Sequence, residues 1–292
     1  MDDVLVASEY ANHLSDADLR LLAMAAGGPP GAAADPSRLR RDPPRLLATL
    51  ADDRVFRAVL DAEGPVAEAA AMVSPFLLFA VAVHRSAAEL ASLDYVPERS
   101  GLGHPVPLFD APALRDFLRD PARRLFLAEL LGSFTKVASG RYRVRAGGRV
   151  QTRRFSELDP VRLAGLLDAV PSAERPGVYR RLGDVALFLT GVFPDYSQHA
   201  FGPVSVARLL RFSHVPAADA GSIADAPAIE LLEQLGSRWY RAALATAPVR
   251  TARLALVAEV ADRFRQARRV LNHMADRYLF PRAFPWLPRP GG

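Results

Sequence analysis

The sequence predicts an all-α fold interrupted by one β-hairpin, and three observations support this prediction. Between residues 250 and 278, apolar side chains recur at alternating three- and four-residue steps, as on the buried face of a helix. An aspartate–proline pair occurs three times where helices are expected to begin, because aspartate accepts free amides and proline lacks one. Alternation with period two is persuasive only at about 141–155. We therefore expect a multi-helix bundle of about ten helices with one inserted hairpin.

Helices are expected along most of the chain. Ser15 and Asp18 form a weak capping box that opens a short helix ending at Met24, and a Gly/Pro-rich linker follows. The three aspartate–proline pairs at expected helix starts are Asp42-Pro43, Asp120-Pro121 and Asp159-Pro160. The other helices are expected at about 43–50, 53–62, 65–83, 85–92, 111–119, 121–139, 160–170, 177–192, 203–213, 227–245 and 250–279.

Four regions follow from this pattern. Residues 1–92 are expected to form an N-terminal helical region, and residues 93–110 a Pro/Gly-rich linker or ordered loop. Residues 111–280 are expected to form a C-terminal helical bundle that carries the hairpin, with a Pro-rich tail at 281–292. We expect the helices 177–192 and 250–279 to lie side by side, and the rest of the bundle to pack around them.

The composition is that of a folded protein with a sizeable core, since half of the 292 residues are apolar. The two most apolar runs, 69–83 and 185–193, are shorter than the ~20 residues that cross a bilayer, which favours buried core helices. No signal peptide is expected. The absence of cysteine excludes disulfides and thiol catalysis and is compatible with a reducing cytosol. The abundant arginine and alanine are typical of a high-GC genome, so we expect a bacterial, cytoplasmic protein.

The hairpin carries the strongest charge signal. Residues 130–156 include seven basic residues and no acidic one, whereas the whole chain has a net charge of +5. Gly147-Gly148 between the two strands suits the positive φ angles of a tight turn. Arginine falls on both faces of the ribbon, so we expect it to project into solvent rather than cover an apolar core. The candidate binding residues are Arg141, Arg143, Arg145, Arg149, Arg153 and Arg154.

Several partners fit such a hairpin. A two-stranded ribbon fits a DNA major groove, and clustered arginines attract phosphate in a salt-dependent way. An acidic protein surface or an anionic lipid would attract the same charges, and a solvated loop without a partner is a further interpretation. Only Tyr142 and Phe155 could stack on bases, so a single-stranded nucleic acid is disfavoured.

Two charged residues stand in apolar helices. Asp184 lies in a helix that is apolar on nearly every side, and Arg268 lies on the apolar seam of the last helix. A buried carboxylate must be paired, hydrogen-bonded or protonated, so we predict that Asp184 meets Arg268 or, as second choice, Arg265. We interpret this as a structural ion pair that fixes helix register, with a ligand or catalytic site as the alternative.

His273, with Asn272 and Asp276, is a second polar candidate. A histidine beside a carboxylate on the next turn could act as a base, but the same residues could form a polar helix edge. The six histidines are scattered without a metal-binding motif, and no phosphate-binding loop is present, so no metal and no cofactor are expected. We expect a binding or regulatory adaptor that uses the basic hairpin. The alternatives are an enzyme with a buried polar pocket between the helices of Asp184 and His273, and a duplex nucleic-acid-binding protein.

Overall fold

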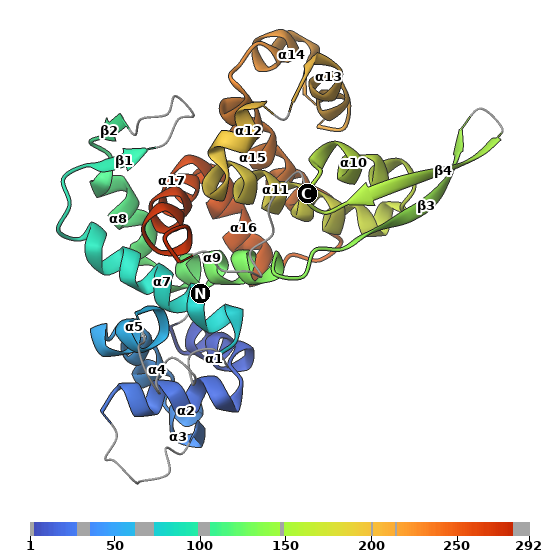
Figure 1. The fold of residues 1–292 in the computed structure, drawn as a ribbon. Helices are drawn as coiled ribbons and strands as arrows, with labels where there is room; N and C mark the ends of the chain where they lie inside the picture. Colours follow the sequence, from blue (N-terminus) through green and yellow to red (C-terminus); the bar gives the residue numbers. More distant parts are fainter. Residues whose placement is uncertain are drawn as a thin grey trace. The chain divides into compact units, whose positions relative to one another are not determined.

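Helices dominate the computed structural model of the chain (Figure 1). The structure describes residues 3–27, 36–61, 73–98, 106–146, 149–199, 201–213 and 215–282. Over these residues there are sixteen α-helices and two two-stranded sheets, which confirms the all-α class with an inserted hairpin. The helices outnumber the expected ten because several are short; α3, α10 and α12 have only five or six residues each.

The capping signals in the sequence do begin helices in the structure. Ser15 and Asp18 form the complete capping box of α2 (Asp16–Ala25), since the Ser15 hydroxyl accepts the Asp18 amide at 3.1 Å and the Asp18 carboxylate accepts the Ser15 amide at 2.8 Å. Three aspartates accept amides at the start of helices whose first residue is proline. They are Asp42 for α4 (Pro43–Leu50), Asp120 for α9 (Pro121–Ser133) and Asp159 for α10 (Pro160–Ala164).

The first of two compact units combines the N-terminal helices with two later segments. It consists of Met1–Val96, Leu108–Thr135 and Asp276–Phe284. Helix α7 is buried along most of its length and packs against α9, while α1 packs against α4 and α9. The expected division at 93–110 thus differs from the observed one, which groups α8 and α9 with the N-terminal helices. Besides α2, α4 and α9, the helices are α1 (Asp3–His13), α3 (Pro36–Arg41), α5 (Asp53–Leu60), α7 (Pro75–Leu90) and α8 (Ala111–Arg119).

The second unit consists of Pro97–Pro107, Lys136–Ala275 and Pro285–Gly292. Its central helix is α11 (Arg175–Val192), which packs against both α15 (Ala228–Thr246) and α17 (Phe264–Met274). The helices predicted at 177–192 and 250–279 do therefore lie side by side. The other elements are β1 (Val96–Glu98), β2 (Val106–Leu108), β3 (Ser139–Ala146), β4 (Arg149–Ser156), α10, the 3-10 turns η1 (Gly165–Asp168) and η2 (Ser172–Glu174), α12 (Pro194–His199), α13 (Pro203–Arg211), α14 (Ala217–Ala224) and α16 (Ala252–Asp262).

Two glycines of α11 allow this close packing. A Cβ added at Gly183 would lie 2.3 Å from the ring of Tyr240 in α15, and one added at Gly191 would lie 2.7 Å from the Cβ of Leu271 in α17. Neither distance leaves room for a methyl group, so the helix backbones approach each other where a side chain is missing.

The prediction of one continuous helix from 250 to 279 is wrong. The backbone leaves the helical region at Arg263 (φ −118°, ψ 31°), between α16 and α17, and a π-helical turn, Ala275–Leu279, ends the segment. The apolar residues on both sides of the break stay buried, so their spacing does not reveal it. Beyond the break, the ring of Phe264 lies so close to Gly236 of α15 that an added Cβ would be 2.4 Å away.

The separate helices predicted at 65–83 and 85–92 are also wrong in their boundary. Helix α7 continues through His84, which is buried, and begins after Ser74, whose hydroxyl accepts the Leu77 amide at 3.2 Å. The Gly147-Gly148 turn, residues 62–72 and residues 283–292 of the expected tail lie outside the described residues. Among the helices that are described, none combines the length and the apolar character that a bilayer crossing requires.

Candidate functional site

The basic hairpin extends from the second unit as an antiparallel ribbon (Figure 1). Strands β3 and β4 pair continuously, from Ser139 opposite Ser156 to Ala146 opposite Arg149. Just beyond the ribbon, the Glu157 carboxylate accepts the Ala138 amide at 2.9 Å and the Arg181 guanidinium of α11 at 3.1 Å. This carboxylate therefore ties the base of the hairpin to the central helix of the unit.

The inner face of the hairpin holds its aromatic residues. Successive residues of a strand point to opposite faces, so the register places Tyr142, Arg153 and Phe155 on the same face. The Tyr142 hydroxyl lies against Gly165, where an added Cβ would be 2.8 Å away, and Arg153 pairs with Asp168 at 3.8 Å. Because this face is turned towards the body of the unit, the aromatic rings do not form an exposed stacking surface.

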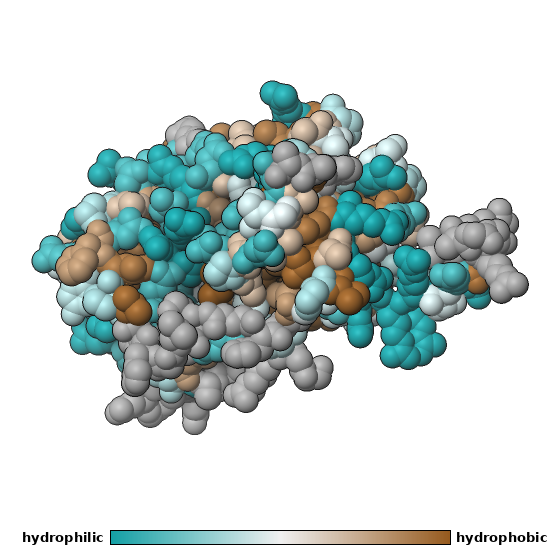
Figure 2. Space-filling model, turned by 90° about the horizontal axis from the view of Figure 1, so that it is seen from above, coloured by the Kyte–Doolittle hydropathy of each residue, from teal (hydrophilic) through white to brown (hydrophobic). Residues whose placement is uncertain are grey.

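The outer face holds the exposed arginines. Arg141 stands directly opposite Arg154, and Arg143 lies two residues further along the same face. All three are exposed, and no carboxylate among the described residues forms an ion pair with them. Val150, 59% exposed, lies on the same face. Seen from above, hydrophilic residues predominate over the described part of the projecting hairpin (Figure 2).

The side chains of Arg145 and Arg149, the other two hairpin candidates, lie outside the described set. The arginine face is therefore defined here by Arg141, Arg143 and Arg154. Like charges directly opposite each other on two strands destabilise a hairpin, so the pairing of Arg141 with Arg154 lowers the stability of the isolated ribbon.

Asp184 is buried, as expected, but the predicted partners are wrong. Its Oδ1 accepts the Tyr240 hydroxyl of α15 at 2.8 Å and the Arg180 Nε at 2.9 Å. Arg180 lies one turn earlier on the same helix, so a local i,i+4 pair replaces the predicted contact with Arg268 or Arg265. Burial raises the pKa of Tyr240 well above its usual value, and the negative charge of Asp184 raises it further.

Arg268 is buried between two carboxylates. It donates to Glu233 of α15 and to Glu98 of β1. Arg265 donates to the other oxygen of Glu233 at 3.1 Å, and Arg269 donates to the second oxygen of Glu98 at 3.2 Å. The charge on the apolar seam is thus neutralised by α15 and β1, and not by α11. Sequence reasoning missed Glu98, which is 170 residues from Arg268.

The remaining polar candidates lie in α17 and just after it. Asn272 and His273 are 1% and 5% exposed in α17, and Asp276 is half-buried in the π-helical turn. Asp184 is hydrogen-bonded to Tyr240 and Arg180, whereas Arg268 is hydrogen-bonded to Glu233 and Glu98. A cavity of about 240 Å³ in the second unit is lined by none of these residues. Its lining is Asp159, Pro160, Val161, Arg162, Tyr196, Phe201, Ser205 and Arg208.

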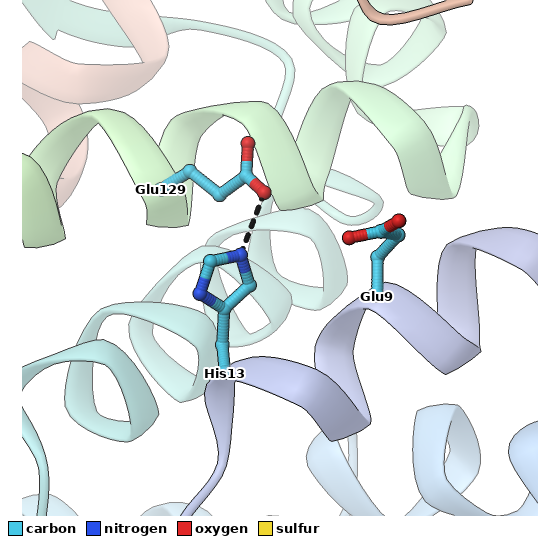
Figure 3. A group of neighbouring side chains, drawn as sticks. All are labelled: Glu9, His13 and Glu129. Atoms are coloured by element: carbon cyan, nitrogen blue, oxygen red, sulfur yellow. Dashed lines mark hydrogen bonds and ion pairs between the residues drawn. The ribbon is translucent and has the colours of Figure 1, made fainter.

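One group of possible metal ligands lies in the first unit, where the sequence predicts none. Glu9 and His13 of α1 and Glu129 of α9 each offer one ligand atom, and these atoms all lie within 4.8 Å of one another. Figure 3 shows Glu9 and His13 extending from α1 towards the helix that carries Glu129. The Glu9–His13 spacing, one helical turn, is visible in the sequence. Glu129 is 116 residues from His13, and no sequence pattern connects them.

Comparison with protein-family models, with curated proteins and with solved structures finds no match to this chain. Its function is therefore inferred from the residues and contacts described above. The hairpin and the Glu9–His13–Glu129 cluster are the two candidate sites, and each belongs to a different unit.

Proposed function

We propose that this chain is a binding or regulatory protein of the adaptor kind, and that the outer face of the β3–β4 hairpin contacts a partner protein with an acidic surface. The observation that carries the proposal is the group of three exposed arginines, Arg141, Arg143 and Arg154, which have no carboxylate partner among the described residues. Glu157 and Arg181 anchor the ribbon, so the arginines are presented from a fixed base.

The electrostatics of the outer face support this proposal. Arg141 and Arg154 repel each other, and an acidic partner would remove that repulsion while it accelerates the encounter between the two molecules. Arginine is also enriched at protein interfaces, where its guanidinium makes several directed hydrogen bonds. The exposed Val150 on the same face adds an apolar contact of the kind that an interface buries.

Duplex nucleic acid is the competing partner, because a ribbon of this kind fits a major groove. The distribution of charge favours a protein instead. The whole excess of positive charge lies at 130–156, and the rest of the chain sums to −2, so the chain outside this segment has no net positive charge that would attract phosphate.

The enzyme alternative receives less support. It requires a polar pocket between the helices of Asp184 and His273, whereas α11 and α17 pack directly on each other at Gly191 and Leu271. The hydrogen bonds of Asp184 to Tyr240 and Arg180 are those of a structural carboxylate.

The test compares two triple variants with the same change of charge. In the hairpin variant, Arg141, Arg143 and Arg154 become glutamine; in the control, the exposed Arg20, Arg208 and Arg250 become glutamine. Each immobilised protein is incubated with host lysate, with and without nuclease, and the bound proteins are quantified by mass spectrometry.

We expect the unaltered chain and the control variant to retain the same acidic protein after nuclease treatment, and the hairpin variant to lose at least nine-tenths of it. Retention that disappears with nuclease would assign the hairpin to nucleic acid. Equal retention by the hairpin variant would exclude the hairpin as the contact surface.

A further inference from the structure

The side chain of His13 is held in place at the end of α1. Its ring stacks on Phe76 of α7, with ring centroids 4.5 Å apart and an interplanar angle of 28°. Its Nε2 lies 2.8 Å from Oε1 of Glu129. Three residues earlier, the buried Tyr10 is hydrogen-bonded through its hydroxyl to Nε2 of His84, also in α7, at 3.3 Å. These contacts fix α1 and orient the imidazole before any ligand arrives.

The two carboxylates come from different helices of the same unit. Glu9 lies one turn before His13 on α1, so both side chains project from the same face of that helix. Glu129 belongs to α9, which packs against α1. Both glutamates are half-buried, whereas the His13 side chain is 37% exposed. The cluster is therefore partly buried at the glutamates and open to solvent at His13.

We propose that Glu9, His13 and Glu129 bind a divalent transition-metal ion, with zinc as its representative. Imidazole nitrogen and carboxylate oxygen are ordinary zinc ligands, and two carboxylates balance the charge of the ion. Tetrahedral bonds of ~2.0–2.1 Å place neighbouring ligand atoms about 3.3 Å apart. Since the three atoms already lie within 4.8 Å of one another, small rotations of the glutamate side chains bring them into position.

The number of ligands gives the site its character. Structural zinc sites use four protein ligands, whereas catalytic and exchangeable sites use three and leave a position for water or a further ligand. Here three residues supply ligands, and the exposed edge at His13 leaves the fourth position accessible. The metal ion takes the place of the hydrogen bond between His13 and Glu129. It would thereby join α1 to α9 more firmly.

The test titrates zinc into the full chain, first freed of metal with a chelator, and follows binding by calorimetry. We expect one zinc ion per chain with a dissociation constant in the micromolar range, and a melting temperature that rises with zinc concentration. His13→Ala, Glu9→Gln and Glu129→Gln should each weaken binding at least ten-fold. Glu174→Gln, an exposed glutamate of the second unit, should bind zinc like the unaltered chain.

X-ray absorption at the zinc edge supplies a direct readout. It should show nitrogen and oxygen ligands with one imidazole in the unaltered chain, and no imidazole in His13→Ala. If His13→Ala does not fold, the nearly isosteric Glu9→Gln decides instead. No zinc binding by the unaltered chain, or unchanged affinity in the variants, would overturn the proposal. The hairpin triple variant should bind zinc normally, which keeps this site separate from the proposed adaptor function.

Discussion

The arginines of the hairpin and the arginine of α17 belong to the same unit, yet their charges are satisfied in opposite ways. Arg268 is 3% exposed and lies between Glu233 and Glu98. Arg141 and Arg154 are exposed, stand opposite each other and pair with no carboxylate that the structure describes. A buried guanidinium must be paired because desolvation is costly, whereas an exposed one keeps its hydration. The contrast separates charge that stabilises the fold from charge available to a partner.

Removing the buried charge has the largest expected effect. Arg268→Met leaves the carboxylates of Glu233 and Glu98, 8% and 13% exposed, with only Arg265 and Arg269 as partners. We expect the free energy of unfolding to fall by about 3–5 kcal/mol in a urea titration, with hairpin binding unchanged in the protein that stays folded. The double change Arg268→Met with Glu233→Leu should recover part of the loss. A single-variant loss below about 1 kcal/mol would contradict the structural role.

Helix α11 offers a matched pair of glycines, one packed and one open. Gly183→Ala places a methyl group 2.3 Å from the Tyr240 ring, which must then move away from Asp184. We expect a loss of about 1–3 kcal/mol in the free energy of unfolding. An added Cβ at Gly177 has no neighbour within 4 Å, so Gly177→Ala should raise that free energy by about 0.5–1 kcal/mol. Changes of the same sign, measured by urea unfolding, would contradict the close packing on α15.

In the first unit, the buried basic residue His84 is neutral, unlike the paired Arg268 and the exposed hairpin arginines. Burial, helped by the positive charge of Arg124, lowers the pKa of His84 to about 3. Above the ordinary histidine pKa of about 6.5, His84 is neutral in both the folded and the unfolded chain, so it contributes nothing to the pH dependence of stability. As the pH falls below about 6.5, only the unfolded chain takes up the proton, so stability should fall by about 1.4 kcal/mol per pH unit.

Urea unfolding between about pH 7 and pH 5 measures this dependence. His84→Gln removes the group that titrates and should flatten the curve, even if the variant is less stable at neutral pH. An identical slope in the variant would mean that His84 takes up its proton at the same pH in the folded and the unfolded chain.

The local features of the fold could be predicted from the sequence. Capping by Asp42, Asp120 and Asp159 depends on neighbouring residues alone, and the hairpin depends on strands that are adjacent in the chain. The break at Arg263 could not be predicted, because the apolar spacing is unchanged across it. That break accompanies the contact of Phe264 with Gly236, on another helix.

For the candidate sites too, the local environment of a residue could be predicted from the sequence, but its distant partners could not. The burial of Asp184 and Arg268 followed from their apolar neighbours, but their partners did not. Spacing along a helix tells which face a residue occupies and not which element covers that face. For this reason Tyr240 and Glu98 were missed as partners, and the Glu9–His13 pair gave no indication that Glu129 completes the cluster.

The smallest expected effect comes from reversing one charge of the hairpin. Arg154→Glu turns the like-charge pair with Arg141 into an opposite-charge pair. Because both side chains are exposed, the free energy of unfolding should rise by only about 0.2–1 kcal/mol. This gain, measured by urea unfolding, should shrink as salt is added, because salt screens charges at the surface. Thr152→Glu, opposite Arg143 on the same face, adds a negative charge without removing a like-charge pair and should give a smaller rise.

The same Arg154→Glu change should abolish retention of the acidic partner. If the variant hairpin is more stable but no longer binds the partner, the pairing of Arg141 with Arg154 serves binding at a cost in stability. A loss of stability would instead mean that a group near Arg154 already compensates its charge. In that case the hairpin would resemble the surroundings of Arg268, and the contrast between exposed and buried arginines would no longer identify a binding surface.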